Sequence, residues 1–450
     1  MKFSEIGYQA LVAKFGQFTG HRLFGPGLLA LVIKVSSAGL SFLMYVVFAH
    51  AMSADDYGKF AFSFNLAIVA AAVASFGYPT GILRYWAKYI ADGKLAEAKG
   101  AMVLGLRLSL IGSTALVVLA GATSLILPNA AHNYLAIAAL AMAIGLSDLV
   151  ANILRAMHHT FSAMFPRDVA WRLASMLAAV IAIIAGYQLS DTVGVYLSAS
   201  LLALLIIPQI YIALHDIKVA VGTAKPIIDW AGISPSLMPL WGAGAIYAII
   251  QQFDVVIVGS LLSGPETGAY FAAQKTATLL SLVLIAGGLV TAPIMAKMFH
   301  DNKMVELQKL CRQLVAAIAV VTLLGLVFLI FAGNPLLRLF SPSFTADYWI
   351  MIILAMGCLV DSVSGSTSYL MQMTAYEKPY LKIMVVCYAV VLVLQFALIP
   401  RFGAYGAAFA SASGTIIWNV WAVWFLRVKA GIDPSILSLV WPIKHVAATK

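Results

Sequence analysis

Residues 314–333 read LVAAIAVVTLLGLVFLIFAG, a run of twenty residues without a charged side chain. A helix of about 20 mainly apolar residues spans the hydrocarbon core of a bilayer, because each residue advances the helix by about 1.5 Å. Strands and buried helices of soluble proteins are shorter or less uniformly apolar. This stretch therefore predicts a membrane-spanning helix.

Comparable apolar runs recur along the whole chain of 450 residues. We expect spans near 28–50, 58–79, 101–127, 134–156, 169–187, 192–214, 233–258, 268–296, 313–333, 346–372, 381–400 and 404–427. With 62% hydrophobic and only 10% charged residues, the chain cannot coat a water-soluble globule, and no room remains for a catalytic domain of ordinary size. The predicted fold is all-α, a polytopic membrane protein of about twelve transmembrane helices.

Positive charges concentrate in alternate loops. If the N-terminus lies inside, the outside loops carry only Lys59, Arg338 and Arg401 of the 28 Lys and Arg residues, and four more fall within spans. The positive-inside rule therefore places both termini in the cytoplasm. The formal net charge of +10 is then explained by a basic cytoplasmic face beside anionic lipids, and no nucleic-acid partner is expected.

An internal repeat becomes visible when the two halves are overlaid. Residues 86–97 (WAKYIADGKLAE) lie over residues 295–306 (MAKMFHDNKMVE), with Ala, Lys, Asp, Lys and Glu in the same places. A similar shift places Asp148 on Asp361. Six spans return the chain to its starting side, so the halves are expected to be parallel six-helix lobes that enclose a central cavity.

The repeat also sets the expected domain boundaries. We expect a cytoplasmic segment at 1–27, an N-lobe at 28–214, a cytoplasmic linker at 215–232, a C-lobe at 233–427, and a cytoplasmic or interfacial tail at 428–450. The repeated segments 81–98 and 297–311 mix apolar and basic residues. We expect both to lie as amphipathic helices on the inner membrane surface.

Seven ionisable residues fall inside the predicted spans. They are Lys34, Arg107, Asp148, Arg172, Asp254, Lys275 and Asp361. An unpaired charge at the bilayer centre costs about 3 kcal/mol on insertion scales, so these side chains should face the bundle interior or a wet cavity. Helical spacing agrees, because Asp148 shares a face with Asn152, and Asp254 shares one with Gln251.

The cations outnumber the carboxylates in this set, which favours an anionic cargo. We hypothesise that Lys34, Arg107, Arg172 and Lys275, with Asn152 and Gln251, line a cavity for a phosphate or pyrophosphate and its sugars. Each cation could instead pair with a carboxylate to hold helices together, and Arg107 and Arg172 could extend to the membrane interface. Asp148, Asp254 and Asp361 are candidates either for coupling to H⁺ or Na⁺ or for helix pairing.

Motifs for other chemistry are not found. Cys311, Cys358 and Cys387 lack the spacing of a disulfide framework or zinc site, and His158–His159 lacks partners for a metal. The chain contains no G-x-x-x-x-G-K-[ST] motif and is therefore not itself an ATP motor. We expect no catalytic residues, no resident metal and no cofactor.

Several stretches resemble the polysaccharide-unit flippases of the multidrug, oligosaccharidyl-lipid and polysaccharide (MOP) exporter superfamily. They are residues 51–60 (AMSADDYGKF), 76–79 (FGYP), 254–259 (DVVIVG), 267–273 (TGAYFAA), 292–293 (AP) and 398–408 (LIPRFGAYGAA). The resemblance covers nearly the whole chain, with Ser53–Ala54 standing where Gly-Pro is usual.

The resemblance implies a flippase rather than an enzyme. Its substrate would be an undecaprenyl-pyrophosphate-linked oligosaccharide, moved by alternating access across the bacterial inner membrane for O-antigen, capsule or exopolysaccharide synthesis. The same pathway implies contact with membrane lipids and, as functional partners, a polysaccharide polymerase and glycosyltransferases.

Three alternatives stay open. A cation-coupled drug or metabolite exporter of the same superfamily would share the architecture, and so would a peptidoglycan-precursor flippase, although fourteen spans are usual there. A membrane glycosyltransferase or polymerase would share the hydrophobicity and the lipid-linked substrate. Such an enzyme usually carries a large external loop, whereas the longest one expected here, near 334–346, is short.

Overall fold

The computed structural model describes residues 24–126, 133–374 and 376–441, and their regular secondary structure is helical. The elements are α2 (Phe24–Ala51), α3 (Ala54–Ala74), α4 (Tyr78–Ala91), α5 (Leu95–Ile126), α6 (Tyr134–Ala156), α7 (Thr160–Phe165), the π-helical turn η1 (Pro166–Ala170), α8 (Trp171–Ile184), α9 (Asp191–Val221), α10 (Trp230–Leu261), α11 (Gly264–Ala277), the 3₁₀ turn η2 (Thr278–Ser281), α12 (Leu282–His300), α13 (Met304–Arg338), the 3₁₀ turn η3 (Pro342–Asp347), α14 (Tyr348–Val363), α15 (Thr367–Met373), α16 (Glu377–Lys429) and α17 (Leu437–Val440). The expected all-α class is confirmed.

Within the described residues, ten helical stretches are long and apolar enough to cross a membrane. The longest, α16, contains Gly403 with non-helical backbone angles (φ 56°, ψ −140°) and is therefore two helical arms. The arms fold back on each other, because a Cβ on Gly414 would lie 2.0 Å from the Val391 side chain. The α7–η1–α8 stretch is also continuous. The layout of twelve spans in two lobes, with the boundaries given above, stays a prediction, and residues 1–23 and 442–450 of its terminal segments lie outside the described residues.

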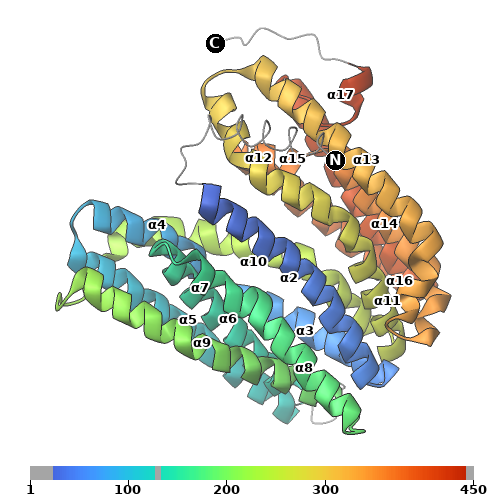
Figure 1. Ribbon diagram of the computed structural model, residues 1–450, viewed down its shortest axis with the longest axis horizontal. Helices are drawn as coiled ribbons and strands as arrows, with labels where there is room; N and C mark the ends of the chain where they lie inside the picture. Colours follow the sequence, from blue (N-terminus) through green and yellow to red (C-terminus); the bar gives the residue numbers. More distant parts are fainter. Residues whose placement is uncertain (1–23, 127–132, 375, 442–450) are drawn as a thin grey trace, which may run out of the picture.

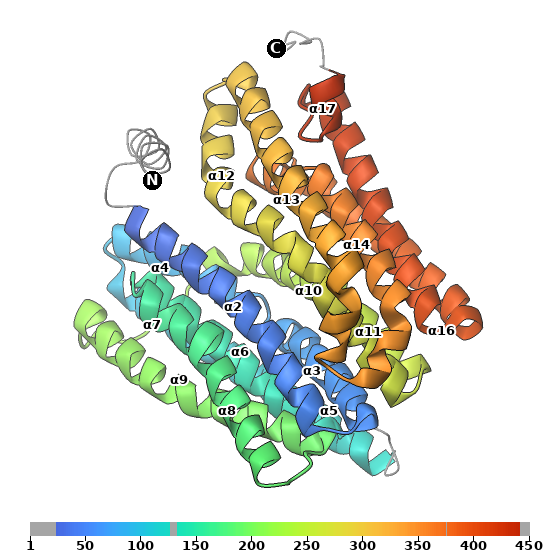
Figure 2. The same ribbon diagram turned by 45° about the vertical axis from the view of Figure 1, so that its right-hand side comes forward.

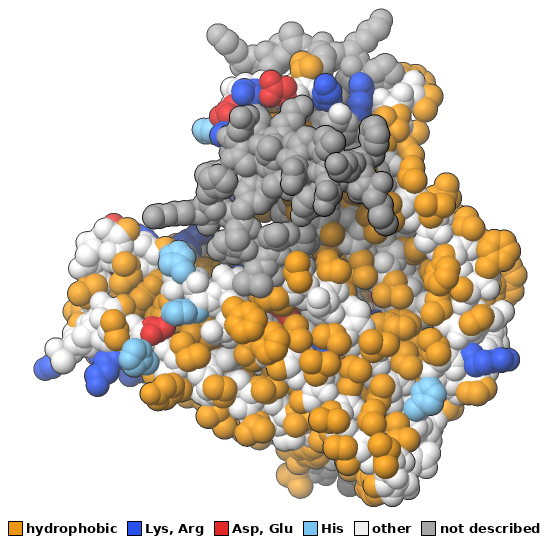
Figure 3. Space-filling view, in the orientation of Figure 1, with side chains coloured by type: hydrophobic (Ala, Val, Ile, Leu, Met, Phe, Trp, Pro, Cys, Tyr) orange, Lys and Arg blue, Asp and Glu red, His pale blue; other side chains and the backbone are white. Residues whose placement is uncertain are grey.

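The helices form two groups (Figure 1). Helices α2 to α9 pack together on one side and α11 to α17 on the other, with α10 running between them, and the rotated view gives the same division (Figure 2). Hydrophobic side chains spread over the face that carries α2 and α8, whereas most of the visible charged side chains lie toward its margins (Figure 3). A surface of this kind suits a lipid environment.

Two helical corners repeat with the same backbone geometry. After α4, Asp92 N donates to the Lys88 carbonyl at 3.0 Å, and Gly93 adopts φ 68°. After α12, Asp301 N donates to the Lys297 carbonyl at 2.9 Å, and Asn302 adopts φ 55°. In 81–98 the expected helix is present as α4, with one buried face that includes Ile82, Tyr85 and Tyr89, and its place on the membrane surface stays a prediction. The expectation of one helix at 297–311 is wrong, because this segment is the end of α12, a tight left-handed turn and the start of α13.

The two groups of helices meet at closely packed glycines. A Cβ on Gly58 of α3 would lie 1.8 Å from the Gly264 carbonyl oxygen of α11, and one on Gly77 would lie 2.4 Å from the Trp241 nitrogen of α10. The Trp241 indole N–H also donates to the Val73 carbonyl at 2.7 Å. Small residues let helices approach closely in lipid, where packing replaces the hydrophobic drive. The seam of α3 with α10 and α11 is therefore a closely packed contact between the two groups of helices.

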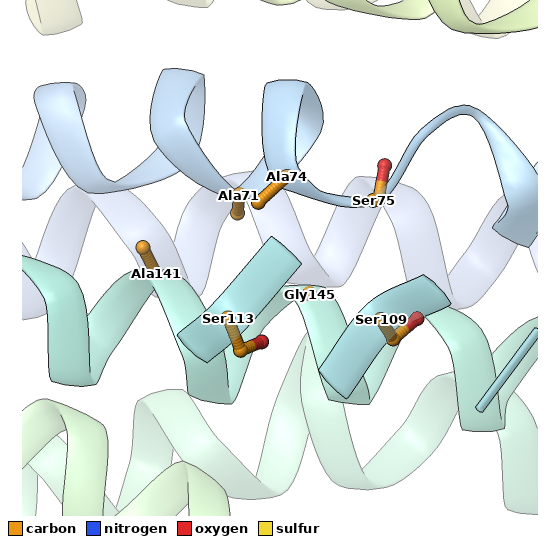
Figure 4. Close-up of a pocket in the computed structure, with 7 residues that line it drawn as sticks. All are labelled: Ala71, Ala74, Ser75, Ser109, Ser113, Ala141 and Gly145. Carbon is orange, nitrogen blue, oxygen red and sulfur yellow. The ribbon is translucent and has the colours of Figure 1, made fainter. Parts of the chain in front are cut away.

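The N-terminal group uses small residues inside it as well. Alanine, serine and glycine residues of α3 and its C-cap, α5 and α6 line a narrow crevice (Figure 4). Beside it, a Cβ on Gly112 would lie 1.9 Å from the Ala74 carbonyl oxygen. We interpret this crevice as a packing seam between helices.

Candidate functional site

An ion pair links α2 to the π-helical turn η1. The Lys34 ammonium lies 3.2 Å from an Asp168 carboxylate oxygen, and the same carboxylate lies 3.8 Å from the Arg172 guanidinium. The Asp168 side chain is only 6% exposed, whereas the Lys34 side chain is 49% exposed. Asp168 is therefore the buried partner of the ion pair, whereas the ammonium group of Lys34 remains partly accessible.

The π turn explains why the next residues are so polar. A π-helical turn widens the helix and disturbs the regular ladder of backbone hydrogen bonds, and such turns are frequent at functional sites. Here Arg172 NH1 donates to the carbonyls of Arg167 at 2.9 Å and Asp168 at 2.8 Å. The Nε of the same side chain donates to the Ser41 hydroxyl of α2. Arg172 thus satisfies the carbonyls of the turn and fixes it against α2.

Arg167 extends the cluster to α6. Its guanidinium pairs with the Asp148 carboxylate. Asn152 donates to the Asp148 carbonyl at 2.8 Å and accepts from Arg155 at 3.2 Å. We call Lys34, Asp148, Arg167, Asp168 and Arg172 the N-half charge cluster. Three cations against two carboxylates give it a net charge of one positive.

Lys275 of α11 reaches α2 from the other half. Its ammonium lies 5.0 Å from the Phe271 ring centroid and 5.9 Å from that of Tyr45, and within the described residues it forms no ion pair. Lys34, Ser41 and Tyr45 lie on one face of α2, where eleven residues cover about 16 Å. The structure therefore places three of the four expected cations, Lys34, Arg172 and Lys275, along this face.

The remaining expected site residues lie elsewhere. Arg107 is exposed on α5 between the exposed Leu106 and Leu110, and it has no hydrogen bond or ion pair with any described residue. Gln251 is exposed on α10, one turn after the exposed Tyr247. The structure does not bring Arg107 or Gln251 to the N-half charge cluster.

Asp254 and Asp361 belong to a different kind of arrangement. Asp254 of α10 accepts hydrogen bonds from Gln395 at 2.8 Å and Ser411 at 2.6 Å, which lie on the two arms of α16. Asp361 of α14 accepts one from Asn419 at 2.9 Å. Neither carboxylate has a cationic partner among the described side chains.

Both amides keep a free acceptor. The buried Gln395 Oε1 and Asn419 Oδ1 have no hydrogen-bond partner in the described part of the chain. The amide nitrogens donate to the carboxylates, and the unpaired amide oxygens add acceptors of the kind that hard cations and protons seek. We call these two units the carboxylate–amide pairs.

The sequence reasoning missed five polar residues of these sites: Arg167, Asp168, Gln395, Ser411 and Asn419. Asp168 was placed in a loop, although its spacing of four from Arg172 puts the two on one helical face. Gln395 and Asn419 are single amides in long apolar runs, which is itself a signal because buried polar groups in membranes need partners.

Solved structures with a similar fold define the class of protein. A multidrug-resistance MATE transporter of the MOP superfamily in its inward-facing conformation superposes with a TM-score of 0.70 at 13% identity, covering 89% of this chain and 98% of that one. The lipid II flippase MurJ in an inward closed conformation gives a TM-score of 0.67 at 15% identity, covering 92% and 91%. The chain therefore has the fold of MOP-superfamily transporters, and the expectation of a multi-pass membrane protein is confirmed.

The sequence then identifies the family. Residues 27–299 match the model of the polysaccharide biosynthesis protein family, and this chain belongs to that family. The probable flippase AglR of Haloferax volcanii is 25% identical over 173 residues, which are 38% of this chain and 36% of that relative. An uncharacterised membrane protein of Methanocaldococcus jannaschii is 21% identical over 430 residues, which are 87% of this chain and 81% of that relative. The match to AglR thus spans about a third of its length.

Proposed function

We propose that this protein is a flippase that moves an undecaprenyl-pyrophosphate-linked oligosaccharide across the bacterial inner membrane, with both termini in the cytoplasm. The product would supply O-antigen, capsule or exopolysaccharide synthesis. The observation that carries the proposal is the line of Lys34, Arg172 and Lys275 along one face of α2, a helix apolar and long enough to span a bilayer.

Electrostatics favours a pyrophosphate on this face. The N-half charge cluster has a net positive charge, and the half-exposed Lys34 can turn from Asp168 to an incoming phosphate oxygen. Lysine binds phosphate as a point charge, while arginine can contact it with two parallel N–H groups. The described contacts of the Lys275 ammonium are with aromatic rings and not with a carboxylate. A bound anion would therefore stabilise this charge more than the charges of Lys34 and Arg172, which already have Asp168 as a partner.

The sugars need a polar route, because each hydroxyl moved unpaired into hydrocarbon costs about 4 to 8 kcal/mol. A cavity between the two groups of helices would replace their water, while the lipid tail stays in the bilayer through a lateral opening. The seam of α3 with α10 and α11 supplies a joint about which the groups could rock, as in other two-repeat transporters.

The carboxylate–amide pairs suit coupling to H⁺ or Na⁺. Asp254 and Asp361 lack cationic partners among the described residues, and each lies beside an amide with an unpaired oxygen. Asp148 differs, because its pairing with Arg167 suits helix association rather than coupling. In this proposal, Asp148 and Asp361, which match in the sequence repeat, would have different roles.

Glycosyltransferases that build the lipid-linked unit and a polymerase that consumes it would be the functional partners. The second candidate function is a cation-coupled exporter of small molecules. It is favoured by the likeness to a MATE multidrug transporter and by the unpaired carboxylates of the C-terminal half. The cations along α2 favour an anionic head group instead.

The test is deletion of the gene in the source organism, with surface polysaccharide and lipid-linked intermediates followed together. Loss of polymer with intact oligosaccharide-lipid accumulating in the inner leaflet is the expected result. Complementation with K34Q should fail, and complementation with R107Q should succeed, because Arg107 is exposed and has no partner among the described residues. Unchanged polymer with raised drug sensitivity would support the exporter.

A further inference from the structure

A group of aromatic side chains gathers in the C-terminal half around Asp361. Tyr369 of α15 and Tyr380 of α16 both lie within electrostatic range of Tyr247 of α10 and of Asp361. The Tyr380 hydroxyl bonds Ser368, and its ring meets the Trp418 ring edge-on at a centroid distance of 5.9 Å. We call Tyr247, Tyr369, Tyr380 and Trp418 the aromatic cluster.

The aromatic cluster borders an open face of α10. Tyr247 is 58% exposed, and Gln251 is exposed one turn further along. On the turn before, a Cβ added to Gly244 would meet nothing within 4 Å. The exposed sides of α9 and α13 carry mainly Leu, Ile and Val, whereas this face carries Gly244, Tyr247 and Gln251. Such a stripe suits a wet cavity better than lipid.

The chemistry of this face differs from that of the N-half charge cluster. The Asp361 carboxylate accepts a hydrogen bond from Asn419 and forms no ion pair with any described Lys or Arg side chain. Aromatic rings offer flat apolar faces with a polar rim, and tyrosine hydroxyls both donate and accept. A pyranose presents the complementary pattern, with C–H groups on its faces and hydroxyls around its edge.

We propose that the aromatic cluster, with Gln251, binds a neutral pyranose ring of the cargo head group while the N-half charge cluster holds the pyrophosphate. This inference rests on the proposed flippase function and specifies its substrate. A uronic acid at this position is disfavoured, because its carboxylate would face Asp361 without a cation to offset the repulsion. The pyranose at this position, which the proposal takes as the one linked to the pyrophosphate, is therefore neutral.

The test compares two ligands with the purified full-length protein. The probes are undecaprenyl pyrophosphate and undecaprenyl-pyrophosphoryl-N-acetylglucosamine, and the readout is Kd by microscale thermophoresis. Wild type should bind the glycosylated lipid more tightly. Y247A should weaken that binding by about three- to tenfold, the range expected for loss of one aromatic contact, and leave binding of the sugar-free lipid unchanged. K34Q should weaken both.

Controls separate this inference from the function on which it rests. Y211A removes a tyrosine that is 74% exposed on α9 among exposed Leu and Ile residues, and it should change neither Kd. Q251L, at an exposed position, keeps the fold and should repeat the sugar-specific loss. If Y247A and Q251L weaken the binding of both ligands equally, or weaken neither, the sugar subsite is refuted, whereas the flippase proposal is not. If wild type binds neither lipid, the flippase proposal fails, and the subsite fails with it.

Discussion

Replacing Asp168 by Asn tests the centre of the N-half charge cluster while keeping the shape of the side chain. Removing one partner of a fully buried ion pair costs about 3 to 5 kcal/mol, whereas an exposed pair contributes about 1 kcal/mol or less. Asp168 is buried, but Lys34 is half exposed, and Arg172 keeps its hydrogen bonds to Ser41 and two carbonyls. We therefore expect D168N to lower the free energy of unfolding by about 2 kcal/mol, between these limits.

The assay is denaturant unfolding of the detergent-purified protein for wild type, D168N, K34M and the double variant. Because both single changes remove the same ion pair, the double variant should lose about 1 kcal/mol less than the sum of the two singles. D55N provides the matched control, since its pair with Lys59 joins side chains that are 50% and 31% exposed. A loss no larger than that of D55N, or strict additivity in the double variant, would refute the idea that Asp168 anchors Lys34.

Three further changes test other parts of the structure. G58A should reduce folded yield and transport, because its Cβ would lie 1.8 Å from a carbonyl oxygen of α11. G39A has open space around it and should be neutral. Equal yields of the two variants by size-exclusion chromatography would contradict the close packing of α3 against α11. D254N should leave folding intact and make transport into vesicles insensitive to the H⁺ or Na⁺ gradient; retained gradient dependence would remove the coupling role. The hydrogen bond from the Gly232 N–H lowers the pKa of the Asp229 carboxyl, so its stabilisation of the start of α10 is present above the unfolded-state pKa and is lost as pH falls through the lower folded value. D229N should flatten this acid loss of stability in thermal unfolding scans from pH 7 to pH 3, and an unchanged profile would contradict it.

Most of the fold could be predicted, because a chain that spans a lipid bilayer has few alternatives to long apolar helices. The span expected at 134–156 coincides with α6, and the hairpin expected between 381–400 and 404–427 coincides with the two arms of α16. The predictions of helix boundaries failed where the apolar pattern of the sequence does not show where a helix ends. Segment 297–311 looks amphipathic, but the left-handed Asn302 makes it a corner between two helices. In 81–98 the helix expected is α4, and it ends at Ala91 before the left-handed Gly93.

The site was less predictable, because charges were counted within assumed spans. Asp168 lay just outside an expected span, yet the π turn makes it part of a continuous helix and buries it. Arg107 lay inside a span but is exposed among apolar side chains. Whether an intramembrane charge faces a partner or the surface depends on tertiary packing, and sequence spacing alone does not encode it.

The surroundings of two carboxylates that the sequence repeat pairs differ in charge, and under the proposed function this difference would orient the cargo. Asp148 and Asp361 occupy matching places in the repeat, yet Asp148 is paired with Arg167 and Asp361 has only the amide of Asn419. The N-half charge cluster therefore has an excess of cations, whereas the surroundings of Asp361 present aromatic rings, an amide and a carboxylate. Under the proposed function, that asymmetry would orient an anionic head group with neutral sugars, because turning it around would set the pyrophosphate against Asp361 and the sugars against Lys34. Exchange of charge between the halves, as in a K34D/D361K variant, should abolish transport even if the protein still folds.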